Sequence, residues 1–101
     1  MSSAASDDVV ELLQYALAHS SASAATKLDI LLDRAIASLA RLGDRGRVVP
    51  ELQVRGIGVY REVIRGYYRI VYRIIGREVW VLAVVDGRRQ LDGLLYGRAR
   101  R

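Results

Sequence analysis

The sequence predicts a single α+β domain in which an N-terminal helical hairpin packs on a three-stranded antiparallel sheet. Three observations support this fold class. Apolar residues recur at helical spacing from residue 9 to residue 42, they alternate with polar residues from residue 59 to residue 85, and short glycine-containing turns separate the alternating segments. With 101 residues the chain is too short to divide, so residues 1–101 are predicted to form one domain.

The first helix is predicted to begin at Asp7 and to end near His19. Ser6 is a favourable N-cap, and Asp7 and Asp8 would act as caps that place negative charge at the positive end of the helix dipole. The apolar stripe of this helix consists of Val9, Leu12, Leu13, Ala16 and Leu17. A short polar linker at residues 20–23 then leads to a second helix.

The second helix is predicted to begin at Ala24, with Ser23 as its cap, and to end at Gly43, which can adopt a left-handed conformation. Its apolar stripe consists of Leu28, Leu31, Ala35, Leu39 and Leu42. Two antiparallel helices joined by so short a linker can present one continuous apolar surface to a sheet.

Residues 44–47 are predicted to form a loop, because Pro50 prevents a helix from continuing and holds Val49 extended. Period-two alternation then predicts three strands joined as an antiparallel meander, at residues 59–65, 67–74 and 79–85, with a short turn at Ile75-Gly76-Arg77. Residues 90–98 are predicted to form a short helix or a packed tail.

One face of this sheet would cover the helical hairpin, and the other face is expected to be half exposed. Arg69 and Arg73 share the exposed face with Tyr67, and Trp80 is expected to cover part of the same layer. The pattern therefore predicts a continuous surface of arginines and aromatic rings. Arg69 would either grip a phosphate there or stack on Trp80.

Charge is distributed unevenly along the chain. Residues 1–44 carry three cations and six acids, whereas residues 45–101 carry thirteen arginines, five acids and no lysine. Arginine is preferred over lysine where a planar fork must grip phosphate or carboxylate in two places. The C-terminal part is therefore predicted to meet a polyanion or an acidic protein.

Several classes of site are excluded by composition. The absence of cysteine excludes disulfides and Cys-ligated zinc, and a single histidine excludes a His cluster and a Ser-His triad. We expect neither a metal nor a cofactor. No apolar run reaches the length of a membrane span, and residues 1–8 lack the features of a signal peptide, so a cytoplasmic protein without membrane contact is predicted.

Four motifs in register resemble the RelE/ParE superfamily of bacterial toxins. They are Gly46-Arg47-Val48-Val49-Pro50-Glu51-Leu52, Tyr60-Arg61-Glu62, Tyr68-Arg69-Ile70-Val71-Tyr72-Arg73, and Val81-Leu82-Ala83-Val84 followed by Gly87-Arg88-Arg89. The resemblance covers roughly residues 5 to 95. Relatives begin with a short strand before the first helix, and here that strand is either missing or trimmed. A missing strand would leave a sheet edge open to an antitoxin segment or a second copy of the chain.

The resemblance implies the toxin of a type II toxin-antitoxin pair, neutralised by a cognate antitoxin. ParE-like members inhibit DNA gyrase through protein contact, and RelE-like members cleave mRNA on the ribosome. We favour the ParE-like activity for three reasons. The basic part has no lysine to donate a proton, Asp86 stands where many relatives have histidine, and Tyr96 matches the RelE C-terminal tyrosine only with an insertion.

The resemblance also implies site residues. If the protein is a RelE-like endoribonuclease, the catalytic residues would be Arg69, Arg88, Arg89 and Tyr96. Residues expected to contact the antitoxin or the target are Arg47, Arg61, Arg65, Arg69, Arg73, Trp80, Arg88 and Arg89. The assembly is left open between a homodimer and a toxin-antitoxin hetero-oligomer. A third hypothesis is a non-toxic RNA- or DNA-binding module that stacks bases on Tyr67 and Trp80.

Overall fold

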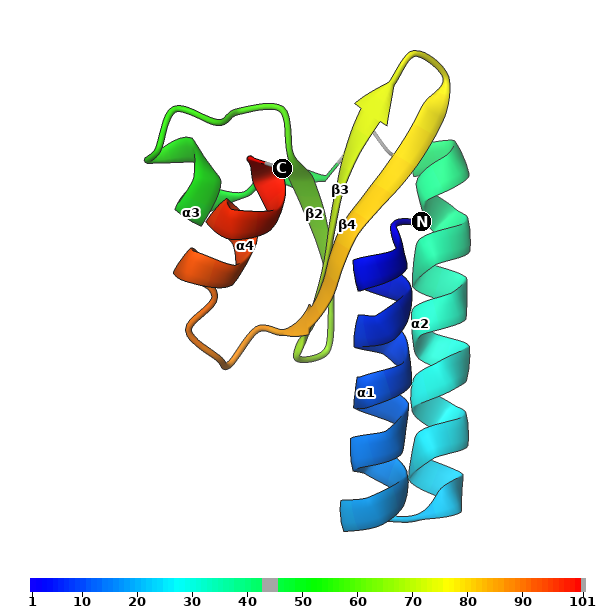
Figure 1. Cartoon of the computed structure of the whole chain (residues 1–101). Helices are drawn as coiled ribbons and strands as arrows, with labels where there is room; N and C mark the ends of the chain where they lie inside the picture. The colour runs from blue at the N-terminus through cyan, green and yellow to red at the C-terminus, as the bar shows by residue number, and fades with distance from the viewer. Residues whose placement is uncertain (43–45, 101) are drawn as a thin grey trace.

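The chain folds as a four-stranded antiparallel sheet with two helices on each side (Figure 1). A computed structural model describes residues 1–42 and 46–100. Its elements in chain order are α1 (Ser3–His19), α2 (Ala22–Leu42), β1 (Arg47–Val48), α3 (Pro50–Gln53), β2 (Arg61–Arg65), β3 (Tyr68–Ile75), β4 (Glu78–Asp86) and α4 (Asp92–Ala99). The strands lie in the order β1-β2-β3-β4. The predicted α+β class, with its helical hairpin on an antiparallel sheet and its short C-terminal helix, is confirmed.

α1 begins one turn earlier than the sequence predicts. Its N-cap is Ser2, whose hydroxyl accepts a hydrogen bond from the Ala5 N–H at 3.0 Å, so the expected cap Ser6 lies inside the helix. The choice is decided by tertiary contact, because the Ser2 N–H also donates to the carbonyl of Val81 on β4 at 3.1 Å. Asp8 therefore lies in the second turn and does not act as a cap.

α2 also begins earlier than predicted, since Ser21 rather than Ser23 accepts the hydrogen bond of the first turn, from the Ala24 N–H at 3.0 Å. Its buried face includes Leu28, Leu32, Ala35 and Leu39. Leu31, which the predicted stripe contained, is 37% exposed, and Leu32 takes its place at 1%. Gly43, the predicted helix stop, lies outside the described residues.

The sheet has one strand more than predicted. β1 has only two residues, which pair with Glu62 and Arg61 of β2, and such a strand is too short to produce a period-two pattern. Gly46 positions it: its N–H donates to the Tyr72 hydroxyl at 3.1 Å, and a β-carbon at this position would collide with that hydroxyl. Between β3 and β4 a bulge at Val71/Tyr72 changes the register.

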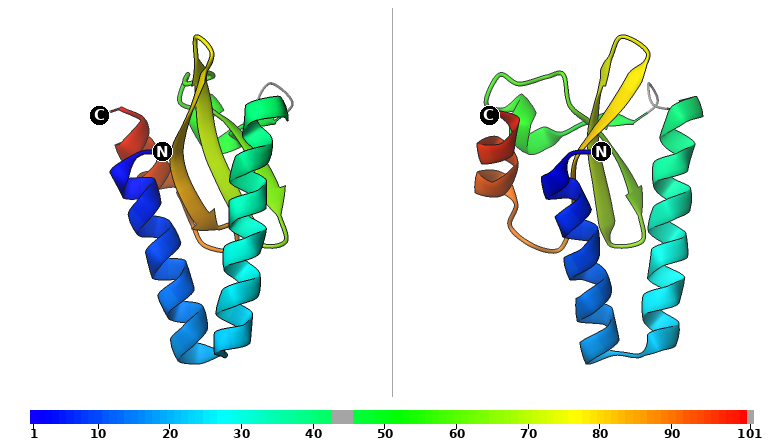
Figure 2. Two further views of the ribbon diagram at one scale, coloured as in Figure 1. Left: turned by 90° about the vertical axis from the view of Figure 1, so that its right-hand side faces the viewer. Right: turned by 45° about the vertical axis from the view of Figure 1, so that its right-hand side comes forward.

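Two apolar cores lie on the two faces of the sheet. Figure 2 shows the two helix pairs on opposite sides of the sheet. The first lies under the α1–α2 hairpin and includes Leu32, Leu39, Ile70, Tyr72 and Val84. The second lies under α3 and α4 and includes Leu52, Val71, Ala83, Leu91 and Leu95. The second core covers the middle of the face that was expected to be half exposed, whereas Ile64, Ile75 and Trp80 on the same face remain 44–49% exposed. Pro50, interpreted as a helix breaker, occupies the first turn of α3, where proline is tolerated.

Replacing Leu32 by alanine is predicted to destabilise the fold by about 2–5 kcal/mol, because it opens a cavity between α2 and the sheet. The neighbouring substitution Leu31→Ala is the matched control, with an expected loss below about 1 kcal/mol at this partly exposed position. Urea unfolding monitored by circular dichroism measures both. Equal losses in the two variants would contradict the assigned face of α2.

Candidate functional site

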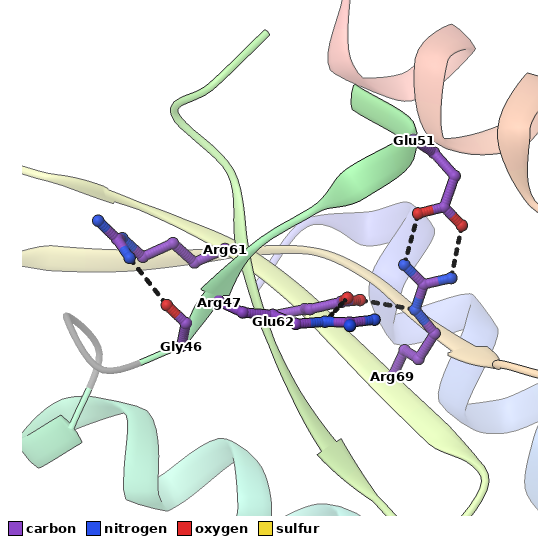
Figure 3. A network of polar contacts seen from close by, with 6 residues as sticks. All are labelled: Gly46, Arg47, Glu51, Arg61, Glu62 and Arg69. Atoms are coloured by element: carbon purple, nitrogen blue, oxygen red, sulfur yellow. Dashed lines mark hydrogen bonds and ion pairs between the residues drawn. The ribbon is translucent and has the colours of Figure 1, made fainter. Parts of the chain in front are cut away.

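The arginine of the Tyr-Arg-x-x-Tyr motif lies at the centre of a buried ionic network (Figure 3). Arg69 projects from β3 and is 8% exposed. Its two terminal nitrogens donate to the two carboxylate oxygens of Glu51 at 2.6 and 2.7 Å, and its Nε donates to Oε1 of Glu62 at 2.6 Å. Each of its three nitrogens is therefore engaged by a carboxylate.

The network extends from Arg69 to the edge of the sheet. Glu62, on β2, is 1% exposed, and its second oxygen accepts a hydrogen bond from Nε of Arg47 at 2.6 Å. One chain of ion pairs, Arg47–Glu62–Arg69–Glu51, thus connects β1, β2, β3 and α3. A buried carboxylate such as Glu62 is tolerated only when it is paired in this way.

The ion pairs shift the pKa values of the groups that form them. The hydrogen bonds of Arg69 to Glu51 raise the pKa of Arg69 above its ordinary value, with a further contribution from Glu62, and burial only partly opposes this. The same hydrogen bonds hold the pKa of Glu51 below its ordinary value of 4.5, again against the effect of burial. Both groups are therefore charged at neutral pH.

These contacts correct the predicted placement of Arg69. It does not lie on an exposed face beside Arg73 and Tyr67, and it does not stack on Trp80. Its cross-strand partner is Val85, whereas Trp80 lies opposite Arg73. The predicted continuous surface of guanidinium groups is absent, because α3 covers this part of the sheet and contributes Glu51 to Arg69.

The other arginines of β1, β2 and β3 that were predicted to contact the antitoxin or the target lie in separate surroundings. Arg47 belongs to the buried network, although its side chain remains largely exposed. Arg61 donates to the carbonyl of Gly46 at 2.8 Å, and Arg65 donates to the carbonyl of Ile64 at 2.9 Å. Arg73 lies over the ring of Tyr60 at 5.7 Å, and its Nε is buried without a hydrogen-bond partner in the described part of the chain.

Arg88 and Arg89 lie together after β4, as predicted, and line the same groove, but their side chains have different partners. Arg88 forms an ion pair with Asp86 at 2.6 Å and stacks on the ring of Tyr67 at 4.1 Å. Hydrogen bonding from Arg88 lowers the pKa of Asp86. Arg89 has no ion pair among residues 1–42 and 46–100 and lines an open groove of about 660 Å³ between α1, β4 and α4. Acidic residues of α1, including Glu11, line the same groove.

Tyr96 lies apart from these arginines. It packs against the second core, and the guanidinium groups of Arg55 and Arg100 lie over its ring at 4.1 and 5.2 Å. The four residues predicted as a RelE-like catalytic set therefore fall into three different surroundings. Arg69 is buried in the network, Arg88 and Arg89 follow β4, and Tyr96 lies on α4.

The sequence interpretation missed Asp8. Its carboxylate accepts a hydrogen bond from the backbone N–H of Val84 at 2.9 Å and forms a two-bond ion pair with Arg98 of α4 at 2.6 and 2.8 Å. Arg98 also donates to the carbonyl of Leu82 at 3.2 Å. The backbone N–H of Ser2 adds a hydrogen bond to the carbonyl of Val81. Backbone groups along the outer edge of β4 are thus partly satisfied, and the edge that was expected to be open is partly covered.

The glutamates of the network were also missed. Glu62 shares one face of its strand with Tyr60 and Ile64, and an acidic residue between apolar neighbours on one face was the one signal that a buried cation lies nearby. No comparable signal marks Asp8, because adjacent acids near a helix start are typical of caps. In the described ranges 1–42 and 46–100, no cluster of three or more histidine, aspartate or glutamate side chains could hold a metal ion.

The hairpin, the meander and the Tyr-Arg-x-x-Tyr segment together define a class, the small toxins of the RelE/ParE superfamily. A family model described as "ParE toxin of type II toxin-antitoxin system, parDE" matches residues 1–91, and the chain belongs to this ParE family. Toxins of this family pair with a cognate ParD antitoxin. No curated protein matches the chain. None of the helices among the described residues is both long and apolar enough to cross a membrane.

Replacing Arg69 by methionine is predicted to destabilise the protein by about 3–5 kcal/mol, because Glu62 then stays buried without its main partner. Chemical denaturation measures the loss. The additional substitution Glu62→Leu should restore part of the stability, and Arg77→Met on the exposed β3–β4 turn is the control with almost no effect. A loss below about 1 kcal/mol for Arg69→Met would contradict a structural role for the network.

The lowered pKa of Glu51 predicts a pH dependence of stability. The group stabilises the fold fully above its ordinary pKa of 4.5, and this contribution disappears as the pH falls through the lower pKa of the folded state. The stability difference between the wild type and Glu51→Gln should therefore be constant near neutral pH and shrink in acid. Denaturation of both proteins between about pH 3 and pH 7 tests this, and a difference independent of pH would contradict it.

Proposed function

We propose that this toxin inhibits DNA gyrase through protein contact and carries out no chemistry on RNA. The observation that carries the proposal is the engagement of Arg69 by two carboxylates. To stabilise the charge of a cleaved phosphate, this guanidinium would have to leave Glu51 and Glu62. Glu62 would then remain buried with only Arg47 as a partner, which is energetically costly.

The surroundings of the remaining RelE-like residues support the same conclusion. Cleavage of RNA needs groups that meet around one phosphate, yet Tyr96 and Arg88 are positioned by separate elements. The chain has a single histidine, His19, which stacks on Tyr15 at the end of α1 with a ring separation of 4.2 Å. It is the last residue of α1, at the end of the helix opposite Ser3.

The surface of the second face also argues against a nucleic-acid-binding module. Such a module would stack bases on Tyr67, but the guanidinium of Arg88 already covers a face of this ring at 4.1 Å. The groove that contains Arg89 is lined by both acids and arginines, which suits a protein partner better than a polyanion. Because gyrase acts on chromosomal DNA, the proposal places the toxin in the cytoplasm.

Two assays on the purified protein test this function: supercoiling by gyrase, and mRNA cleavage in a translating extract. We expect inhibition of supercoiling with no cleavage. Cleavage without effect on gyrase would support the RelE-like alternative and overturn the proposal. Inertness in both assays, combined with salt-sensitive binding to DNA or RNA, would favour the nucleic-acid-binding alternative.

Within the same supercoiling assay, Arg89→Ala is predicted to weaken gyrase inhibition about tenfold, as expected when a central contact residue is truncated. Arg89 makes no ion pair in the described part of the chain, so the variant should fold normally. Arg77→Ala, on the β3–β4 turn, is the control with wild-type inhibition. Equal inhibition by all three proteins would remove Arg89 from the contact surface.

A further inference from the structure

Residues 86–89 form a turn that begins at the last residue of β4, and backbone hydrogen bonds hold it to the sheet. The Arg89 N–H donates to the carbonyl of Asp86 at 3.2 Å, which closes the turn, and the Gly87 N–H donates to the carbonyl of Tyr67 at 2.7 Å. Asp86 itself pairs with Tyr68, the first residue of β3. The turn is therefore tied to the start of β3 as well as to β4.

The side chain of Asp86 closes the same turn a second time. Its Oδ1 accepts a hydrogen bond from the Arg88 N–H at 2.9 Å, as in turns that an aspartate caps from two residues away. The Arg88 guanidinium donates to both carboxylate oxygens, from Nε to Oδ1 at 3.0 Å and from Nη2 to Oδ2 at 2.6 Å. It also lies over the ring of Tyr67 at 4.1 Å. The Arg88 side chain is thus directed back onto the turn.

Gly87 rests on the aliphatic stem of Arg69. A β-carbon at position 87 would lie 2.9 Å from Cδ and 3.0 Å from Cγ of Arg69, and 3.0 Å from the carbonyl oxygen of Tyr67. Arg69 cannot easily move away, because its guanidinium is bound by Glu51 and Glu62. The turn therefore packs on a side chain that the buried network holds in place.

Arg89 differs from Arg88 because it forms no ion pair within the described ranges 1–42 and 46–100. It is exposed and lines the groove between α1, β4 and α4. An unpaired guanidinium can receive a carboxylate through two parallel hydrogen bonds. Because the turn already fixes the backbone of Arg89, less conformational freedom is lost when such a partner binds. The turn thus presents Arg89 as an anchor for an acidic side chain.

We infer that Asp86 is a positioning residue for the gyrase contact: it holds the turn so that Arg89 meets a carboxylate of gyrase. The inference rests on the proposed function and names the group on gyrase that Arg89 binds. Asp86 acts through Arg88 and the backbone of the turn. Of the three side chains, only Arg89 reaches the partner.

Charge alone would give Asp86 the opposite effect. Hydrogen bonding from Arg88 lowers the pKa of Asp86, and the nearby charge of Arg89 adds to this, so Asp86 is ionised beside Arg89 at neutral pH. An ionised carboxylate at this place repels a carboxylate of the partner, and its removal would strengthen binding. Positioning predicts that its removal weakens binding. The sign of the change in Asp86→Ala therefore separates the two roles.

Inhibition of gyrase supercoiling by the purified toxin variants measures this sign. Asp86→Ala should weaken inhibition about fivefold, because the turn loses its side-chain hydrogen bonds. Asp86→Asn should recover most of the loss, since its amide oxygen can still accept from the Arg88 N–H. Glu78→Ala removes the same charge at the other end of β4 and is the matched control, expected within about twofold of wild type. Thermal unfolding shows that the variants remain folded.

Two further variants test whether Asp86 acts through Arg89. In the background of Arg89→Ala, the substitution Asp86→Ala should change inhibition by less than about twofold, because the side chain that it positions is gone. Gly87→Ala keeps every charge, but its β-carbon displaces the turn from Arg69 and Tyr67. This variant should also weaken inhibition, and it should likewise add nothing to Arg89→Ala.

The outcomes distinguish this inference from the proposed function. A wild type that inhibits gyrase, with an Asp86→Ala variant that inhibits equally or more strongly, overturns the positioning role and leaves the function intact. Additive losses from Asp86→Ala and Arg89→Ala would make Asp86 a direct contact, which also overturns it. A wild type without effect on gyrase refutes the proposed function, and the inference with it.

Discussion

The enclosure of Arg69 by two carboxylates is the constraint on which the rest of the structure depends. A guanidinium beneath a covering helix is tolerable only if its nitrogens are paired, and Glu51 and Glu62 supply the pairing from α3 and β2. The same contacts hold α3 against the sheet and so enclose the second apolar core. One charged group thereby helps to hold α3 over the middle of the second face, whose margins at Ile64, Ile75 and Trp80 remain exposed.

The buried network changes where the protein can contact partners. Because the middle of the sheet is covered, the exposed cations are distributed over the ends of strands and the outer sides of helices. Arg89 lines a groove with acids from α1, and Lys27 and Arg34 line a second open groove between α2 and β2. A single guanidinium surface is absent, and the family assignment rests on the fold and on the match over residues 1–91.

A second ion pair, between Asp8 and Arg98, covers the edge of the sheet at β4. Their ion pair joins the second turn of α1 to α4, across the edge strand β4. Backbone groups at Val84 and Leu82 are satisfied by these side chains instead of by a further strand. Charged side chains at a sheet edge oppose unwanted strand pairing, so this pair contributes to keeping β4 from associating with other chains.

The sequence by itself determined the helical hairpin, the antiparallel meander and the resemblance to ParE toxins, because periodicity and turn residues act over a few neighbouring positions. Only the tertiary structure decided which charges are buried. Glu51 and Arg69 are separated by 18 residues, and Asp8 and Arg98 by 90, so no local pattern records that they meet. Short elements such as α3 have too few residues to show a period, yet α3 decides the environment of Arg69.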